Sequence, residues 1–392
     1  FELVTATTRR LSVATGGAQA NAASYNVALT TDGDAAVFDS AASNLVGGDT
    51  NGVADIFARL IPADTTGRVS IRSDGTQADR ASTEPATDDA ARFVVFTTLT
   101  DFDPDDQNAG TDIYVRDRQT GTTTWVSRVI RAGPFSVNHR APAISADGQV
   151  LAFESTAPDL VSPATSGLKH IFAGPVGSLQ VVSVGLRLAN RTADIFGLDS
   201  IGNLTLNMTP AEHVGRWVEI TSGTGAGQVR LISANTTTTL VVAPAWTTAP
   251  DNTSVFRVVE EANGASRAAA VSGDGRFVAF ESTATNLAPG DTNGVSDIFV
   301  HDRDTGETFR VSLMLQLPNQ TADIFGPDSI GYSGLNMTPN EHVGRLVEIA
   351  KGTGAGQVRL IVTNNETTLT VDRAWETVPD KFSVFHISSE AN

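Results

Sequence analysis

The 392-residue chain combines 40% hydrophobic residues with a formal charge of −17 and contains no cysteine. The acidic excess disfavours nucleic acid and anionic membrane surfaces as partners, because both attract basic side chains. The lack of cysteine excludes disulfides and thiolate metal sites, and no apolar run is long enough for a membrane span. We interpret Phe1 as the processed N-terminus of an exported protein.

Residues 1–23 precede the first repeat of the chain. They contain Arg10-Leu11-Ser12-Val13, which matches the end of a later strand, Arg68-Val69-Ser70-Ile71. We therefore predict a strand at Arg9, Arg10, Leu11, Ser12 and Val13 that is not part of any of the four blades. Such a strand is unstable alone and seeks a sheet edge, which makes this segment a candidate for self-association. The alternative is ordinary ring closure, in which the strand completes a blade of its own chain.

A unit of four short strands occurs four times, three times in residues 24–186 and once in residues 264–315. The spacing of roughly 57 residues between the first copies is that of a four-stranded propeller blade. Aromatic residues mark the second and third strands of each copy. They are Phe38 and Phe57, Phe96 and Tyr114, Phe153 and Phe172, and Phe280 and Phe299. The fourth strands are predicted at 68–71, 124–128, 180–184 and 309–313.

The fourth copy contains Ser272-Gly273-Asp274-Gly275, then Ala279-Phe280, then Asp297-Ile298-Phe299-Val300. This pattern resembles the WD40-like repeats of TolB-type β-propellers. Copies one and two depart from it, because Thr30 and Thr87 replace the serine. The resemblance implies an all-β fold of propeller-type blades and says almost nothing about function, since propellers host binding, scaffolding and catalysis.

Two further segments, residues 187–263 and 316–392, align with each other without a gap and are similar along their whole length. Alternating residues in the first predict strands at 217–220, 228–232, 239–242 and 254–258. We expect each segment to form a small β-barrel or sandwich module with its own core. Trp246 and Phe256 are the predicted core anchors of the first module, and Trp375 and Phe385 those of the second.

Acidic loops recur in copies one, two and four, and we expect the three to behave alike. Alternating oxygen side chains with a nearby turn can wrap Ca²⁺, so calcium is a possible cofactor. The alternative is that aspartate and asparagine cap a turn through the backbone. Copy three has lost the pattern. The nine candidate ligands are Asp49, Asn51, Asp55, Asp106, Asn108, Asp112, Asp291, Asn293 and Asp297.

Eight Asn-x-Ser/Thr sequons are possible glycosylation sites if the source glycosylates exported proteins. All lie in the two modules. They are Asn190, Asn203, Asn207, Asn235, Asn252, Asn319, Asn336 and Asn365.

The function we favour is a non-catalytic, exported bacterial structural protein, secreted or at the cell surface. It would self-associate head to tail into a filament by β-strand addition, with itself as partner. An unclosed head-to-tail contact of this kind produces open filaments. The alternatives are a secreted monomeric propeller that binds a protein or glycan and a propeller enzyme acting on polysaccharide. No residue is singled out in one copy as a catalyst would be, which argues against the enzyme.

Overall fold

The computed structural model describes residues 8–106, 108, 110–128, 137–289, 291 and 293–390. Regular structure in these residues is β-strand, which confirms the predicted all-β fold. No helix in this part is long and apolar enough to cross a membrane. The chain forms two compact units. One runs to Ser282 and includes Val300–Thr308, and the other comprises Thr283–Phe299 and the residues from Phe309 on.

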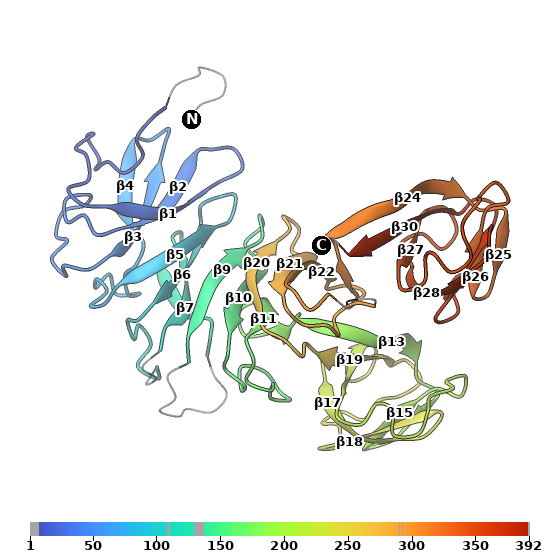
Figure 1. Cartoon of the computed structure of the whole chain (residues 1–392). Coiled ribbons are helices and arrows are strands. Elements are labelled where there is room, and N and C mark those ends of the chain that lie inside the picture. Colours follow the sequence, from blue (N-terminus) through green and yellow to red (C-terminus); the bar gives the residue numbers. More distant parts are fainter. Residues whose placement is uncertain are drawn as a thin grey trace. The chain divides into compact units, whose positions relative to one another are not determined.

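Four sheets of four antiparallel strands correspond to the four sequence repeats (Figure 1). Blade one contains β1 (Ser24–Leu29), β2 (Ala35–Ser40), β3 (Asp55–Leu60) and β4 (Thr65–Arg68). Blade two contains β5 (Ser82–Thr87), β6 (Phe93–Thr98), β7 (Asp112–Asp117) and β8 (Thr122–Trp125). Blade three contains β9 (His139–Ile144), β10 (Leu151–Ser155), β11 (His170–Gly174) and β12 (Gln180–Val181). Blade four contains β20 (Ser266–Val271), β21 (Phe277–Ser282), β22 (Asp297–Asp302) and β23 (Thr308–Arg310).

The first strands of successive blades are neighbours, β5 lying beside β1 and β9, and β20 beside β9. This is the arrangement of propeller blades around a common axis. Within blades one to three, the predicted aromatic residues face each other directly across the second and third strands. The rings of Phe38 and Phe57 are 6.0 Å apart, as are those of Phe153 and Phe172. Their burial supplies much of the blade core.

The first strand of every blade carries a bulge at the same place. The pairing with the second strand shifts there, and the bulged residue has a positive φ although it is not glycine. These residues are Asn26, Glu84, Ala141 and Ala268, with φ of 49°, 55°, 50° and 55°. Because the feature recurs at one repeat position, it belongs to the blade design and is not a local irregularity.

The two modules are seven-stranded antiparallel sheets of the same topology. Module one contains β13 (Val184–Thr192), β14 (Ile195–Phe196), β15 (Ser200–Gly202), β16 (Trp217–Ser222), β17 (Val229–Asn235), β18 (Thr239–Ala243) and β19 (Val255–Glu261). Module two contains β24 (Leu313–Thr321), β25 (Ile324–Gly326), β26 (Ser329–Gly331), β27 (Leu346–Lys351), β28 (Val358–Asn364), β29 (Thr368–Val371) and β30 (Val384–Glu390). Each sheet surrounds a separate apolar cluster.

The predicted core anchors of the modules are buried at equivalent places. Trp246 and Trp375 are 5% and 4% exposed, and both indole N–H groups donate to a backbone carbonyl 3.3 Å away. Phe256 and Phe385 are fully buried in the same clusters. The expectation of two modules with their own cores is therefore confirmed.

Two boundary predictions were wrong. The fourth strands end about three residues earlier than predicted, because the chain leaves the sheet ladder where Ser70 and its counterparts turn toward the third strand. The module boundaries drawn at 186/187 and 315/316 fall inside β13 and β24. Each of these nine-residue strands starts almost directly after the last strand of a blade and continues into the module.

The positive φ of Ala268 leads to a stability prediction. Glycine reaches this conformation without the steric cost that alanine pays, so Ala268→Gly should raise the unfolding free energy by about 0.5–1 kcal/mol. Ala270→Gly is the matched control, because Ala270 is also exposed and lies in β20, but its φ is not positive. It should lower stability by about 0.5–1 kcal/mol. Urea unfolding curves would measure both, and a destabilised Ala268→Gly would contradict the strain argument.

Candidate functional site

An aspartate–serine hydrogen bond holds the end of the fourth strand to the start of the third. In blade one, the Ser70 hydroxyl donates to Asp55 Oδ1 at 2.5 Å and accepts from the backbone N–H of Ile56 at 3.0 Å. Blade two repeats both contacts, with 2.6 Å between Ser127 Oγ and Asp112 Oδ1. Ser312 and Asp297 form the same pair in blade four. The last candidate calcium ligand of each loop is thus already used in the fold.

The asparagines of the acidic loops act as turn caps. In each loop, the asparagine Oδ1 accepts from the backbone N–H two residues later, and its Nδ2 donates to the aspartate that begins the third strand. The amide therefore turns a donor toward the carboxylate, whereas a cation would need its oxygen. This geometry supports the turn-capping alternative over calcium. The asparagines concerned are Asn51, Asn108 and Asn293.

In copies one and four an arginine lies between the two carboxylates of the loop. Arg68 is 3.5 Å from Asp49 and 3.6 Å from Asp55. Arg310 is 3.4 Å from Asp291 and 3.5 Å from Asp297. The arginine side chains and both aspartates are almost fully buried in each case. The residues of these two loops do not fit a Ca²⁺ ion, because a guanidinium already supplies the positive charge.

Copy two differs from copies one and four, contrary to the expectation that the three behave alike. Trp125 stands where copies one and four have arginine, and its indole N–H donates to Asp112 at 2.8 Å. Asp106 accepts from the Tyr114 hydroxyl at 2.8 Å. Burial and the nearby charge of Asp112 raise the pKa of Asp106 to about 7. This loop has two carboxylates and no arginine between them.

Copy three has His170 in place of the aspartate. The Ser183 hydroxyl accepts from the backbone N–H of Ile171 and lies 3.0 Å from His170 Nδ1, while His170 Nε2 lies 2.7 Å from Glu261. The serine contact is thus retained with an imidazole as partner. Among the described residues, no group of three or more acidic or histidine side chains is placed to hold a metal. Calcium binding stays a prediction, and copy two is the loop that leaves it open.

A threonine hydroxyl on or beside the fourth strand of a blade binds a backbone carbonyl in the chain before that blade. We name this contact the interblade hydrogen bond, because it joins blade one to blade two and blade three to blade four. Thr66 Oγ1 donates to the Val13 carbonyl at 2.5 Å, and Thr123 Oγ1 donates to the Ile71 carbonyl at 2.6 Å. Each threonine accepts from a buried arginine, Arg59 at 3.1 Å and Arg116 at 3.0 Å. The carbonyl belongs to the residue directly after an Arg-x-Ser sequence, Ile71 at the end of blade one and Val13 in the segment before blade one.

Blade four retains this contact although module one is inserted before it. Thr308 donates to the Val184 carbonyl and lies 2.9 Å from His301 Nδ1, with His301 at the position of Arg59. Blade four therefore follows blade three as blade two follows blade one, and module one is an insertion in the connection. Sequence reasoning missed this contact. Its signal was a threonine recurring at one repeat position, with a basic residue seven positions before it.

The predicted self-association segment lies against blade one. Val13 accepts from Thr66, Thr15 Oγ1 accepts from the Thr66 backbone N–H at 3.0 Å, and Arg9 forms an ion pair with Asp64 at 2.8 Å. Regular strand structure is limited to one isolated bridge between Val13 and Gln19. The predicted continuous strand over residues 9–13 was therefore wrong, because most of its backbone has no partner strand among the described residues. Residues 1–7 lie outside them.

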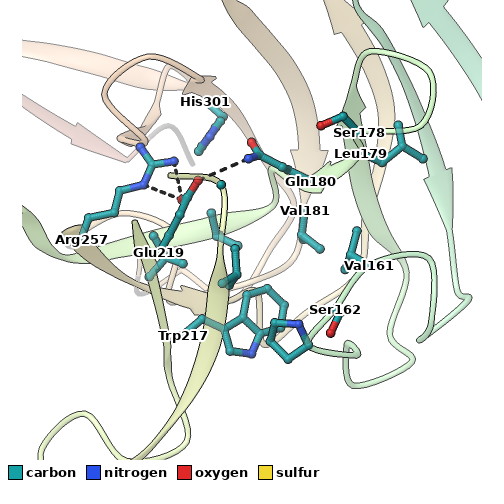
Figure 2. Close-up of a pocket in the computed structure, with 15 residues that line it drawn as sticks. Val161, Ser162, Ser178, Leu179, Gln180, Val181, Trp217, Glu219, Arg257 and His301 are labelled. Carbon is teal, nitrogen blue, oxygen red and sulfur yellow. Dashed lines mark hydrogen bonds and ion pairs between the residues drawn. The ribbon is translucent and has the colours of Figure 1, made fainter. Parts of the chain in front are cut away.

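A cavity of about 170 Å³ lies next to the third interblade hydrogen bond, between blade three and module one. Figure 2 shows its two sides. Glu219 and Arg257 form a buried ion pair on one side, with 2.8 Å between Arg257 Nε and Glu219 Oε2, and Gln180 donates to Glu219 at 3.3 Å. Val181 and Trp217 belong to the other, apolar side.

His301 lines the same cavity as a neutral imidazole. Burial and the neighbouring Arg257 lower the pKa of His301 to about 3. Because Thr308 Oγ1 donates to the Val184 carbonyl, it accepts from His301 Nδ1, which therefore carries the proton. The Nε2 atom is then an acceptor. The cavity was not predicted from the sequence, since its residues come from separate parts of the chain.

Among the candidate glycosylation sites, Asn235 is a correction. It is 6% exposed, accepts from the His213 backbone N–H and donates to the carbonyls of Thr209 and Thr236. A glycan on Nδ2 would replace one of these two donated hydrogen bonds and would have to be attached at a buried side chain. Asn203 is half-buried, and the other six are exposed.

No protein-family model matches the sequence, and no curated protein is similar to it. Solved structures show only a distant similarity. A protein from Agrobacterium tumefaciens assigned as TolB has 9% identity and a TM-score of 0.36, covering 94% of this chain and 91% of its own. TolB of Acinetobacter baumannii has 14% identity and a TM-score of 0.23, covering 84% and 61%. Oligogalacturonate lyase of Vibrio parahaemolyticus has 10% identity and a TM-score of 0.28, covering 80% and 71%.

These similarities are too low to support any inference about activity. The four-stranded antiparallel blades in the described residues themselves confirm the expectation of an all-β chain with propeller-type blades.

The elevated pKa of Asp106 predicts a pH dependence of stability. Between about pH 4 and pH 7 the folded state holds a proton that the unfolded chain has released, so the contribution of Asp106 to stability falls as pH rises through this range. Asp106→Asn keeps an acceptor for Tyr114 but cannot ionise. It should therefore flatten the fall in melting temperature over this range and raise the melting temperature at pH 8.

Asp49→Asn is the matched control, because Asp49 is the counterpart of Asp106 but lies beside Arg68. It should lower the melting temperature at pH 8, since it removes a negative charge from a buried guanidinium. If Asp106→Asn also lowered the melting temperature at pH 8, the ionised Asp106 carboxylate would have to be stabilised by a cation bound from solution. Calcium addition and chelation with the wild type would then show whether that charge is a metal ion.

Proposed function

We propose that the chain is a non-catalytic structural protein of the bacterial envelope or exterior that self-associates head to tail through residues 10–13. The observation that carries the proposal is that residues 10–20 have the conformation of residues 68–78 but lack the strand that accompanies them there. The backbone bonds of Val13, Ala14, Gly17 and Ala20 repeat those of Ile71, Arg72, Gly75 and Ala78 one for one.

The missing contacts are those of a third blade strand. In blade one, Arg68 lies between two carboxylates and Ser70 binds Asp55, whereas Arg10 is exposed and its side chain contacts Gln19. Arg68 makes the equivalent contact to Gln77. Residues 10–12 therefore have the residue types and conformation of a fourth strand, while no third strand pairs with them in the described part of the chain.

Blade four of a second copy is the best acceptor. Its own strand end, Arg310-Val311-Ser312-Leu313, has almost the same sequence as Arg10-Leu11-Ser12-Val13. The corresponding ends of blades one and three are held by the next blade, since Thr123 binds the Ile71 carbonyl and Thr308 binds the Val184 carbonyl. Within the described residues, such a threonine contact is found neither at the Arg128 carbonyl, which ends blade two, nor at the Leu313 carbonyl, which ends blade four. Blade two is already followed by blade three in the same chain, so we take the end of blade four as the acceptor.

In the proposed assembly, residues 10–13 of one copy replace residues 310–313 in blade four of another. Arg10 then lies between Asp291 and Asp297, and Ser12 binds Asp297. Exchange of equivalent segments loses few contacts, as in domain swapping. The assembly is stabilised by the new contact between blade four of one copy and blade one of the next. Val13 stays bound to Thr66 in blade one of its own molecule. Blade four of one copy and blade one of the next therefore become neighbours, as successive blades are within one chain. Repetition of this contact gives a chain of molecules.

Arg10→Glu should abolish self-association while leaving the monomer folded. The arginine is exposed in the single chain, but in the assembly it would place a third carboxylate beside Asp291 and Asp297. Light scattering after size-exclusion chromatography would measure the mass over a concentration series. The wild type should grow in mass with concentration, and Arg10→Glu should stay monomeric.

Arg140→Glu is the control, because Arg140 is also exposed and the charge change is the same, but it lies outside the segment. It should assemble like the wild type. A wild type that remains monomeric at high concentration would refute the proposal, as would an Arg10→Glu variant that still assembles.

A further inference from the structure

The cavity beside module one has the size of a single six-membered ring. Its volume is about 170 Å³, and a cavity of about 150 Å³ in another protein holds benzene. The cavity lies against elements that are otherwise well packed, since Trp217, Glu219, Arg257 and His301 are all less than 10% exposed. The cavity is open to solvent on one side, where Ser162 and Ser178 are exposed, so a small molecule can reach it.

The two sides of the cavity differ in polarity (Figure 2). Valines and Trp217 form the apolar side, and Gln180, Glu219, Arg257 and His301 gather on the other. A purely apolar ligand would leave polar groups on that second side without hydrogen bonds, which is unfavourable. A ligand that is polar on all sides would gain no binding free energy from contact with the apolar side. The lining therefore favours a ring with C–H groups on one face and hydroxyl groups on its edge.

The charges of the cavity cancel. Glu219 and Arg257 neutralise each other at 2.7 Å, and His301 is uncharged. Neither an anion nor a cation has an unmatched counter-charge to bind. The polar groups offer donors and acceptors to a neutral molecule, with His301 Nε2 and the Gln180 side-chain oxygen as acceptors.

From size, polarity and charge, we infer that this cavity binds one neutral pyranose ring, as a free monosaccharide or as a terminal sugar of a glycan. The Trp217 side takes the C–H face of the ring, and Gln180, Glu219 and His301 bind its hydroxyl groups. This inference is independent of the self-association proposed above, because it uses a different surface and different residues.

Comparison of the two modules supports a dedicated site. The modules are similar throughout, yet module two has Leu346, His386 and Ser388 where module one has Trp217, Arg257 and Val259. All three module-one residues line the cavity. If this surface served only to pack module one against blade three, apolar side chains would do so at lower cost than a buried ion pair. Arg257 even retains a buried Nη1 without a hydrogen-bond partner.

The test is saturation-transfer NMR on the full chain with methyl β-D-glucopyranoside, methyl β-D-galactopyranoside and methyl α-D-mannopyranoside. We expect at least one of them to bind with a dissociation constant in about the millimolar range, as its size allows. Cyclohexanol, a six-membered carbon ring of similar size with one hydroxyl, should bind at least about tenfold more weakly, and so should charged glucuronate.

Trp217→Leu introduces the residue that module two has at this position, so the module fold should tolerate it. It should weaken sugar binding at least about tenfold, whereas Leu346→Trp in module two should leave it unchanged. Gln180→Leu, on blade three, is a second variant that should weaken binding without touching the module core. The inference fails if none of the three glycosides binds, if cyclohexanol or glucuronate binds as tightly, or if both Trp217→Leu and Gln180→Leu bind like the wild type.

Discussion

The hydrogen bond between the first residue of the third strand and a serine at the end of the fourth strand is the constraint on which each blade depends. The fourth strands are only two to four residues long, too short for their ladder bonds alone to hold them. The serine bridges a carboxylate and a backbone N–H, and both partners are buried in blades one and two. In copy three a histidine ring contacts the serine in place of the carboxylate, and the serine still accepts from the backbone N–H, so the serine contact is the common feature.

This constraint also determines where the next blade begins. With the serine held in place, the residue after it presents its carbonyl to the threonine of the following blade, as Ile71 does for Thr123. The insertion of module one does not disturb the contact, because Ser183 is held directly before Val184, the first residue of β13. Blades and modules can therefore alternate along one chain. Residues 10–13 carry the same serine and carbonyl but have no blade of their own in the described residues, and this is the basis on which we propose that they bind a second molecule.

The sequence predicted the blades and modules well, because their signals are local. Alternating residues and the facing aromatic residues of strands two and three repeat at a regular spacing, and Trp246 and Trp375 lie within similar flanking sequences. The sites were harder to predict, because they depend on residues that only the fold brings together. The acidic loops suggested calcium. In copies one and four, however, the positive charge between the carboxylates is Arg68 or Arg310, and each of these arginines comes from the fourth strand of its blade. The cavity combines Gln180 of blade three with Glu219 and Arg257 of module one and with His301 of blade four, and no local motif links them.

The central claim, that residues 10–13 of one molecule occupy blade four of another, is tested most directly by disulfide trapping. Because the chain has no cysteine, a bond can form only between residues that are introduced. One chain would carry Ser12→Cys and a second chain Asp297→Cys, in the places that Ser70 and Asp55 occupy 2.5 Å apart in blade one. Our account predicts that mild oxidation of the mixture yields the mixed disulfide, and that a chain with both substitutions yields a ladder of covalent oligomers. A mixture that stays as single chains, or forms only bonds between identical chains, would contradict it.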